Sequence, residues 1–459
     1  MTDGAPHLAF IVGAAPEGKN HAPVFIVPGL DYDSFSGFQT NNLQAAAEHL
    51  ARELEEAIRR AFPKGCDLIH VHNPLLRKNA RLLGALGLLQ GRGYALLVQE
   101  HDFAEDFRPD VYDRTWPYPD SCDYATINSR DRDNLIASGL DPRHVHLLPN
   151  PVAHQSSFSP REDGAREIAR GRTLALYPVR AIRRKNVGET LLLSRFLPKG
   201  AELAITLPPT STGDFYHYSA WKKRVTEGSW RVRFEAGMKC PLSDLFERSF
   251  CVVTTSVKEG FGYSYLDPLA RGLPVIGRKI PHIVGDFSDA GVDFEGLYES
   301  IRVPSGIIDG ARLRGAVAAR LERYRETFGP AFGGREGEVF EPLLAALERR
   351  FESATLDFGA LDEDLQFSVL ERVREDGDFA KELLRLNPFL ESLFERATEA
   401  DEAIRLRDAV DKGYSEREHG KSLVAAYTAA IARESKGGID KAALIARCLD
   451  PSAFFLSAS

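Results

Sequence analysis

The chain has 459 residues, more than a single hydrophobic core normally supports, so two or three domains are expected. Its hydrophobic content of 43% and charged content of 27% are ordinary for a soluble globular protein. A formal net charge of −8 offers nucleic acid no electrostatic footprint, so we expect no nucleic-acid partner.

The five cysteines are scattered and form neither a CxxC pair nor a zinc-ligand spacing with histidine. This usage favours a reducing compartment. The apolar stretch 8–12 is too short for a signal peptide, and no apolar run is long enough to span a membrane. We therefore expect a cytoplasmic protein without stable membrane insertion.

Short apolar runs alternate with amphipathic helical patterns through the first 330 residues. Such alternation predicts parallel sheets wrapped by helices, with ligands bound at the carboxyl ends of the strands. Strands are predicted at 24–27, 68–71, 94–98, 124–127, 144–148, 174–179, 203–207, 232–235, 250–253 and 274–277. Helices are predicted at 42–60, 75–89, 130–138, 187–196, 219–227, 241–248 and 263–270.

The fold class that we predict is α/β, with two Rossmann-like doubly wound domains facing a cleft and an added helical C-terminal segment. The linker between the domains is placed in 150–171, which is rich in Pro, Ser, Gly and charge. The predicted domains are 1–160, 161–335, a helical insertion at 336–405, and terminal helices at 406–459 that pack back on the core. The insertion carries no catalytic signature, and we expect it to serve packing or homo-oligomer formation.

Residues 254–268 carry the strongest functional signal, because a glycine turn of sequence Glu-Gly-Phe-Gly follows a predicted strand and precedes a predicted helix. Free N–H groups at a helix start can face a phosphate or a sugar hydroxyl, and glycines allow a close approach to the backbone. A carboxylate before the turn can accept hydroxyl hydrogen bonds or balance a developing positive charge. An ordinary strand-to-helix loop with an exposed glutamate is the alternative.

Two cations follow the strand at 174–179, where Arg180 and Lys185 could neutralise a diphosphate as its charge grows. Arginine suits bidentate phosphate contacts, and lysine acts as a point charge. The alternative is that Arg183, Arg184 and Lys185 only solvate a helix start, which the helix dipole disfavours.

In this order, the motifs resemble those of the retaining, nucleotide-sugar-dependent glycosyltransferases with two Rossmann-like domains (GT-B), specifically family 4. The resemblance covers roughly 24–281 and the last helices. In that family a strand ends in Arg-x4-Lys, as at 180–185, and Glu-Gly-Phe-Gly is followed by a second acid eight residues after the first. That second acid is usually glutamate, and here it is Asp267.

The resemblance implies roles for individual residues, with 1–160 on the acceptor side and 161–335 on the donor side. The second acid would hold the ribose hydroxyls, and the amides of the glycine turn would face sugar and diphosphate. The predicted catalytic residues are Arg180, Lys185, Glu259 and His101. The predicted donor-binding residues are Gly260, Phe261, Gly262, Tyr263, Asp267 and Gly37. The predicted acceptor-binding residues are His72, Asn73, Lys78, Asp102 and Ser129.

Local context gives some of these residues an alternative role. Asp102 suits orienting or capping a loop, and Ser129 suits the N-cap of the following helix. Gly37 precedes the first amphipathic helix, whose amides could face a phosphate or an acceptor anion. Helix-start solvation and strand-end capping also explain His72, Asn73 and Lys78.

No metal site is expected, although Asp31/Asp33 and Asp131/Asp133 mimic a metal-binding acid-x-acid pattern. Turn and helix-start positions explain both pairs, and in this architecture cations act on the leaving group. No cofactor is required, and a UDP- or GDP-linked sugar is the co-substrate.

The predicted reaction moves a hexose, glucose or mannose, from a nucleoside diphosphate sugar to an acceptor hydroxyl with retention. The expected acceptor is a small soluble sugar, sugar phosphate or hydroxy acid. One alternative is a nucleotide-sugar epimerase on the same fold. Another is a non-catalytic sugar- or nucleotide-binding subunit, to which only the unusual Asp267 points.

Overall fold

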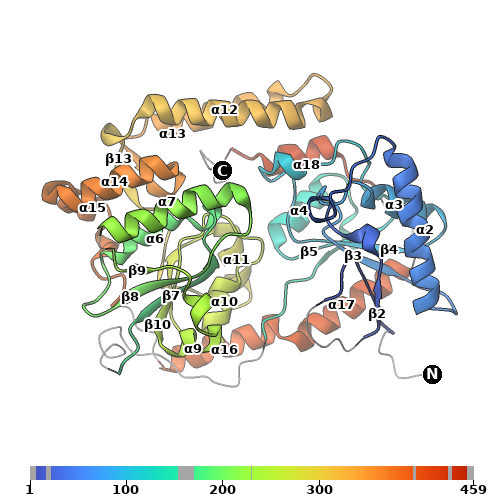
Figure 1. Cartoon of the computed structure of the whole chain (residues 1–459), viewed down its shortest axis with the longest axis horizontal. Coiled ribbons are helices and arrows are strands. Elements are labelled where there is room, and N and C mark those ends of the chain that lie inside the picture. The colour runs from blue at the N-terminus through green and yellow to red at the C-terminus, as the bar shows by residue number, and fades with distance from the viewer. Residues whose placement is uncertain are drawn as a thin grey trace. The chain divides into compact units, whose positions relative to one another are not determined.

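The computed structural model describes residues 7–16, 22–153, 170–228, 230–395, 400–432 and 437–451. The chain divides into two compact units, each with its own parallel sheet and helices (Figure 1). This confirms the predicted α/β class. Unit 1 comprises Met1–Pro149, Arg323–Val339 and His419–Asp450, and unit 2 comprises Asn150–Glu322, Phe340–Glu418 and Pro451–Ser459.

The sheet of unit 1 has four parallel strands, in the order β3-β4-β5-β6. Its two central strands, β4 and β5, are buried along their whole length. A separate parallel pair, β1-β2, precedes this sheet in the chain. The strands are β1 (Phe10–Val12), β2 (Val24–Ile26), β3 (Ile69–His72), β4 (Leu96–Glu100), β5 (Asp123–Thr126) and β6 (Val145–Leu147). The helices include α1 (Asp33–Ser36), α2 (Leu43–Ala61), α3 (Leu82–Gly91), α4 (Ser129–Ala137), α17 (Glu416–Ile431), which begins in unit 2, and α18 (Lys441–Cys448).

Helix α2 shows how the sequence pattern forms structure. The Asn42 side chain caps its N-terminus by accepting a hydrogen bond from the amide of Ala45. Leu50, Leu54 and Ile58 recur at helical spacing and are buried. The helix predicted over 42–60 is therefore confirmed within one residue at each end.

The helix predicted over 75–89 is wrong in its first half, because α3 begins only at Leu82. The preceding segment is a loop held by tertiary bonds that outweigh its helical pattern. The Asn79 side chain donates to the carbonyls of Gly29 and Asp31, and Leu76 forms a bridge with Tyr112. An apolar run that is buried as a loop cannot be distinguished from a buried helix by periodicity.

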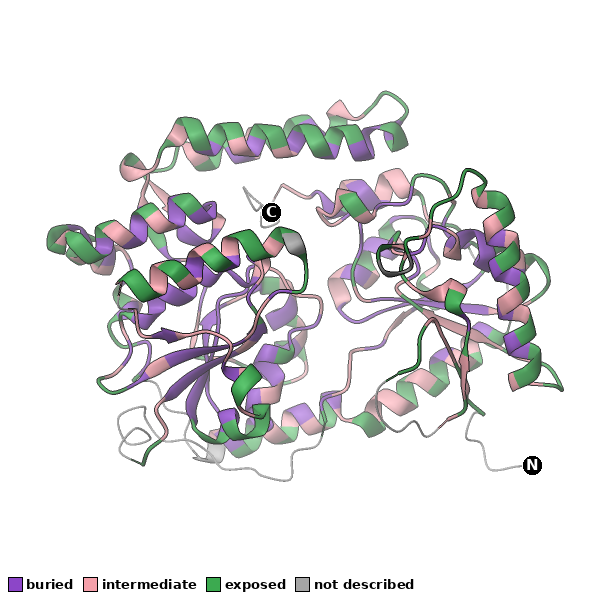
Figure 2. Ribbon diagram, in the orientation of Figure 1, coloured by how far each residue is buried: buried purple, intermediate pink, exposed green. Residues whose placement is uncertain are grey.

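The sheet of unit 2 has six parallel strands, in the order β12-β11-β10-β7-β8-β9. Figure 2 shows its central strands in purple, because nearly all of their residues are buried. The strands are β7 (Leu174–Arg180), β8 (Glu202–Leu207), β9 (Val232–Arg233), β10 (Ser249–Thr254), β11 (Val275–Arg278) and β12 (Leu297–Tyr298). The helices include α6 (Val187–Ser194), α7 (Thr212–Gly228), α8 (Ala236–Lys239), α9 (Leu242–Glu247), α10 (Tyr263–Leu269), α11 (Pro281–Asp289) and α16 (Ala400–Tyr414).

The segment 336–405 contains helices α13 (Gly337–Phe351), α14 (Glu363–Glu375) and α15 (Gly377–Leu386), and also a strand. That strand, β14 (Thr355–Asp357), pairs antiparallel with β13 (Arg302–Pro304). Apolar residues of α14 and α15 belong to the same core cluster as residues of β7, β8 and β10. The segment is thus integral to the hydrophobic core of unit 2.

Helix α12 (Gly310–Phe328) contains one of the boundaries between the units, since its residues up to Glu322 belong to unit 2 and the rest to unit 1. Across the part of the chain that the structure describes, no helix combines the length and apolar character needed to cross a bilayer.

Candidate functional site

The order of strands in unit 2 reverses between β7 and β10, the two strands that precede the predicted motifs. The chain moves from β7 outward to β9 on one side, then returns through β10 to β12 on the other. In open parallel sheets, ligands bind at the carboxyl ends of strands at such a switch point. The Arg-x4-Lys motif and the glycine turn are both located there.

The two cations of the first motif differ in exposure. Arg180 ends β7 and is exposed, with its Nη1 donating to the carbonyl of Pro208 at 3.3 Å. Lys185 ends a 3-10 turn, Arg183–Lys185, and its side chain is 11% exposed. The end of β7 and the turn after it therefore place one exposed and one buried positive charge at the same edge of the sheet.

Glu259 is held between two cations of that turn. Lys185 Nζ donates to Glu259 Oε1, and Arg184 Nη1 donates to Glu259 Oε2 at 3.1 Å. Burial by itself raises the pKa of the Glu259 carboxyl, but Lys185 and Arg184 outweigh burial and the pKa lies below its ordinary value. The carboxylate is therefore ionised at neutral pH.

Hydroxyl groups from the central strands fix the backbone of the cationic turn. The carbonyl of Lys185 accepts hydrogen bonds from Tyr177 Oη and Thr255 Oγ1, each at 2.9 Å. Tyr177 Oη also lies 2.8 Å from Ser256 Oγ, and the amide of Val257 donates to the carbonyl of Arg184 at 3.0 Å. All three hydroxyls are fully buried, so the positions of the cations are set before any ligand binds.

The glycine turn requires glycine at its last position. Gly262 has a φ of 96°, and a Cβ there would lie 2.8 Å from Ile283 Cγ2. Within the described residues, the amides of Phe261, Gly262 and Tyr263 donate to no backbone or side-chain acceptor. These donors can therefore serve a ligand oxygen at the turn.

Phe261 contributes to the turn only through its backbone. Its ring is 5% exposed and packs edge-on against Tyr263, Phe287 and Tyr414, with centroids 5.0–5.9 Å apart. The side chain anchors the turn to α11 and α16, and no face of it is available to a ligand.

Two further predicted donor-binding residues lie on α10. Tyr263 is 43% exposed, and its hydroxyl donates to the carbonyl of Pro151 at 3.3 Å. Burial raises the pKa of Asp267 to about 6, opposed by the positive charge of Arg271. Asp267 is thus partly protonated just below neutral pH, which weakens it as a hydrogen-bond acceptor for hydroxyls.

In unit 1, the structure brings together three of the predicted residues. His72 Nδ1 lies 3.2 Å from His101 Nε2, and the amide of His101 donates to Asn73 Oδ1 at 2.7 Å. Asn73 adopts a φ of 50°, which turns the chain after β3 so that its side chain reaches the end of β4. These residues occupy the carboxyl ends of adjacent parallel strands, where ligands bind.

Two residues that sequence reasoning did not select extend this histidine cluster. His70 stacks against His72 with ring centroids 4.3 Å apart, and its Nδ1 lies 3.0 Å from Tyr427 Oη. Burial, followed by the neighbouring rings, lowers the pKa of His70 to about 3 and that of His72 to about 4. Burial also lowers the pKa of His101, so all three imidazoles are neutral at pH 7.

Three of the predicted acceptor-binding residues have local partners or positions of their own. Lys78 lies over the Tyr32 ring at 5.0 Å, and Asp102 forms an ion pair with Arg108 at 3.2 Å. Ser129 is not the N-cap of α4, because the side chain of Asn128 accepts the hydrogen bond from the amide of Asp131 at 2.8 Å.

Gly37 does not lie at the start of α2. It ends the short helix α1 with a φ of 63°, and α2 begins only at Leu43. A residue in this left-handed conformation terminates a helix, which explains the glycine without a ligand. Gly37 precedes α2, as predicted, with five residues between them, and its role at a ligand stays a prediction.

The two acid pairs also have structural partners. Asp33 accepts from the amide of Ala80 at 2.8 Å and faces Arg81, and Asp131 accepts from Asn128 Nδ2 at 2.8 Å. Among the residues that the structure describes, no group of three or more His, Cys, Asp or Glu is arranged to hold a metal ion.

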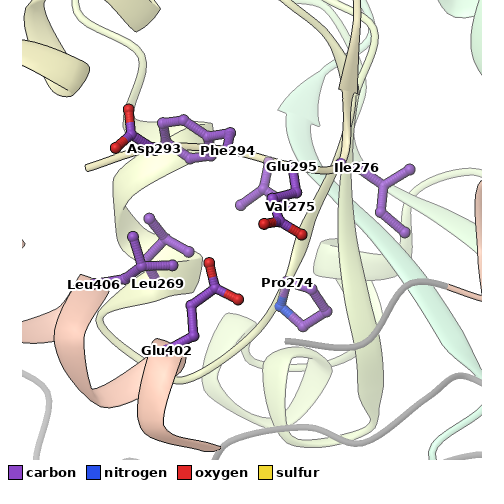
Figure 3. A pocket seen from close by; sticks show the side chains of 10 residues that line it. Leu269, Pro274, Val275, Ile276, Asp293, Phe294, Glu295, Glu402 and Leu406 are labelled. Atoms are coloured by element: carbon purple, nitrogen blue, oxygen red, sulfur yellow. The ribbon is translucent and has the colours of Figure 1, made fainter. Parts of the chain in front are cut away.

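A separate small hollow of about 40 Å³ lies elsewhere in unit 2 (Figure 3). Val275 begins β11, so this hollow is at the amino edge of the sheet, opposite the carboxyl ends that carry the two motifs. In Figure 3 the carboxylates of Glu295 and Glu402 point toward its middle. The hollow is therefore no part of the candidate site.

Comparison with known proteins gives one curated relative. No family model matches the chain. A mannosylglucosyl-3-phosphoglycerate synthase from Petrotoga mobilis is 24% identical over 406 residues, which cover 80% of this chain and 75% of the relative.

Two solved structures are similar at low identity. A sucrose-phosphate synthase from Thermosynechococcus elongatus has a TM-score of 0.49 and 13% identity, covering 93% of this chain and 90% of that chain. A glycosyltransferase from Rickettsia africae has a TM-score of 0.48 and 11% identity, covering 89% and 84%. The similarity to the curated synthase along most of both chains, together with the parallel α/β units, supports a sugar-transferring enzyme.

Proposed function

We propose that this protein, a glycosyltransferase by its similarity to the curated synthase, transfers a hexose with retention of configuration, as family 4 of the GT-B enzymes does. The donor is a nucleoside diphosphate sugar bound mainly by unit 2. The acceptor is a small hydroxyl compound, recognised by residues of unit 1. The five free cysteines fit the cytoplasm as its compartment.

The observation that carries the proposal is the Lys185–Glu259–Arg184 group at the switch point of the unit 2 sheet. Breaking a glycosyl–phosphate bond builds negative charge on the leaving diphosphate and positive charge on the sugar. The group holds two cations and one ionised carboxylate next to amides that donate to no acceptor among the residues that the structure describes. Charges of both signs are fixed in advance, which is the condition for electrostatic stabilisation of such a transition state.

Each cation has its own part in the proposed reaction. Lys185 is fixed and stabilises charge on the departing phosphate, while the exposed Arg180 is able to move onto the diphosphate when the donor binds. Glu259 accepts hydrogen bonds from the sugar hydroxyls. The bond from the anomeric carbon to phosphate breaks as the acceptor oxygen attacks the same face, and the departing phosphate takes the acceptor proton.

The histidine cluster of unit 1 supports a hydroxyl-bearing ligand. A neutral imidazole offers one N–H donor and one nitrogen acceptor, which together match a hydroxyl group that both donates and accepts. His72 and His101 already share one such contact at 3.2 Å. His101 therefore faces a sugar hydroxyl in our proposal, and Asn73 holds its backbone in place.

The name of the curated relative refines the substrates to be tried first. Its product contains mannose, glucose and 3-phosphoglycerate. We therefore propose mannose or glucose as the transferred hexose. The acceptor would be a sugar phosphate, or a hydroxy acid that carries a phosphate.

One observation favours a non-catalytic sugar-binding subunit as the second candidate. Asp267 stands where the family pattern has glutamate, and its raised pKa of about 6 weakens it as a partner for ribose hydroxyls. Such a subunit would bind the nucleotide sugar without transfer or hydrolysis.

Thermal unfolding with UDP, GDP and ADP, and then with their glucose and mannose conjugates in metal-free buffer, tests the donor site. A ligand at 100 times its Kd stabilises the folded protein by about 2.7 kcal/mol, which is an easily measured shift. A shift with one base identifies the donor, and product formation with phosphorylated acceptors then tests transfer. Binding without transfer or hydrolysis would favour the subunit, and no shift with any nucleotide would contradict both candidates.

A further inference from the structure

Asn186, the residue after Lys185, adopts an unusual backbone conformation. Its φ of 53° and ψ of 56° lie in the left-handed region, which few residues other than glycine occupy. The residue is 1% exposed and starts α6 without capping it. A conformation of this kind persists when surrounding bonds hold it, so the partners of Asn186 determine where Lys185 points.

Both ends of the Asn186 side chain are bonded to buried groups. Its Nδ2 donates to Glu189 Oε2 at 2.8 Å, and its Oδ1 accepts from Gln366 Nε2 at 2.8 Å. Gln366 lies on α14 and also donates to the carbonyl of Phe358 at 3.0 Å. The segment after residue 336 therefore reaches the residue next to Lys185 directly.

Glu189 is 0% exposed, and three side chains satisfy its carboxylate. Arg278 donates to both oxygens, from Nε at 3.0 Å and from Nη2 at 2.5 Å, and Tyr298 Oη donates to Oε1 at 2.7 Å. Arg278 also binds both oxygens of Asp357 on β14, at 2.8 and 2.7 Å. A buried carboxylate with this many partners is rigid, and removal of one partner leaves a costly unpaired group.

On the opposite side, hydroxyls hold the carbonyls of the same two residues. Thr255 Oγ1 lies 2.9 Å from the carbonyl oxygen of Lys185 and 3.2 Å from that of Asn186. Thr190 Oγ1 lies 2.7 Å from Thr255 Oγ1. The Lys185–Asn186 peptide is thus held between strand β10 and the segment 357–366.

We propose that Gln366, with Arg278 and Glu189, is a positioning residue that sets the Lys185–Glu259 pair through Asn186. The segment 357–366 is then a required part of the charged site. The expected effect of Gln366 on catalysis rests on the proposed transferase function. Its effect on the position of Lys185 can be tested whether or not the protein is a transferase.

The first test measures how fast a small amine-acylating reagent labels Lys185, read by peptide mass spectrometry. Gln366→Leu should speed labelling of Lys185 several-fold, because release of Asn186 frees the amine from Glu259. Lys222, paired with Glu235 at 2.8 Å in the same unit, is the internal reference and should keep its rate. Ser368→Ala on the exposed side of α14 is the matched control variant and should change neither rate.

An unchanged Lys185 rate in a folded Gln366→Leu protein would overturn the inference, whether or not the protein transfers sugar. If that variant does not fold, Tyr298→Phe replaces it, because this change removes only the hydroxyl that binds Glu189. Faster labelling of Lys222 as well as Lys185 would show general loosening and would also overturn the inference.

The second test uses turnover in a double-mutant cycle. Gln366→Leu should lower kcat about tenfold in the wild-type background and have no further effect beside Lys185→Ala, because its role passes through that amine. Equal losses in both backgrounds would show that Gln366 acts elsewhere. If the wild-type protein transfers no sugar, only the proposed function is contradicted. The proposed role of Gln366 in positioning Lys185 is still decided by the labelling experiment.

Discussion

The charged group of unit 2 (Lys185, Glu259 and Arg184) and the histidine cluster of unit 1 differ in charge state. In unit 2, Glu259 stays ionised because two cations outweigh the cost of burial. In unit 1, burial lowers the pKa of His70, His72 and His101, and the charge of Asp102 beside His101 does not offset it, so the three imidazoles stay neutral. A desolvated group is therefore charged only where close partners of opposite charge outweigh the cost of desolvation.

The largest expected effect comes from removing Lys185, one of the two cations that bind Glu259. Lys185→Ala removes a fixed positive charge, and we expect kcat to fall about 10²–10³-fold, the scale for loss of one preorganised electrostatic contact. Steady-state transfer assays measure this effect. Lys222→Ala, which removes a lysine from an ion pair outside the site, is the matched control and should retain wild-type turnover. Equal kcat for Lys185→Ala and wild type would remove Lys185 from the mechanism.

The neutral imidazoles of His70 and His72 should make the free energy of unfolding depend on pH. The pKa of His70 is about 3 and that of His72 about 4 in the folded protein, against 6.5 for free histidine. The unfolded chain therefore binds protons that the folded chain does not. The free energy of unfolding therefore has its full value above about pH 6.5 and declines as the pH falls toward 4. The decline is at most about 1.4 kcal/mol per pH unit for each proton that only the unfolded chain binds.

Urea unfolding at several pH values measures this slope. His70→Asn should flatten it, whereas the largely exposed His72 contributes less because solvent screens it. Ser368→Ala, a change at an exposed residue without a titrating side chain, is the control and should leave the slope as in the wild type. The same slope in His70→Asn and wild type would contradict the neutral state of His70.

A smaller effect is expected for His101→Asn, which keeps a donor and an acceptor but changes their reach. We expect transfer to slow about tenfold, or about 1.4 kcal/mol, with nucleotide affinity nearly unchanged, because His101 faces a sugar hydroxyl in our proposal. Comparing kcat/KM for the acceptor with the Kd of the nucleoside diphosphate separates the two effects. Loss of nucleotide affinity would place His101 outside the role proposed here.

The smallest expected effect concerns Asp267. With a pKa of about 6, its carboxyl becomes neutral as pH falls from 7 to 5, and donor affinity should fall a few-fold over that range. Asp267→Asn should bind the donor a few-fold more weakly at pH 7 and show a flatter pH profile. Calorimetric titration at pH 5, 6 and 7 would measure both, and identical profiles would show that Asp267 does not contact the donor.

Sequence patterns predicted the central strands and helix α2 well, because buried strands and one-sided helices have short, local signatures. They also indicated Lys185 and Glu259, which are 74 residues apart but follow the adjacent strands β7 and β10. The contact of Arg184 with Glu259 was not predictable, since its direction depends on the 3-10 turn. His70 and Tyr427 are 357 residues apart, and no local pattern joins them.

The misplaced predictions share one cause. The start of α3 and the cap of α4 were each read from neighbouring residues. Distant contacts decide the first, such as those of Asn79 with Gly29 and Asp31. The second depends on which of two adjacent polar residues the backbone selects as the cap, Asn128 over Ser129.

Neither unit is a continuous stretch of sequence, since each takes residues from three separate parts of the chain. During synthesis, the sheet of unit 1 must wait for α17, whose Ala426 and Ala430 cover Leu97 and Ala125. Until α17 leaves the ribosome, those apolar strand residues stay uncovered. The nascent protein is therefore expected to depend on chaperones, and premature termination should give aggregation instead of a folded N-terminal fragment.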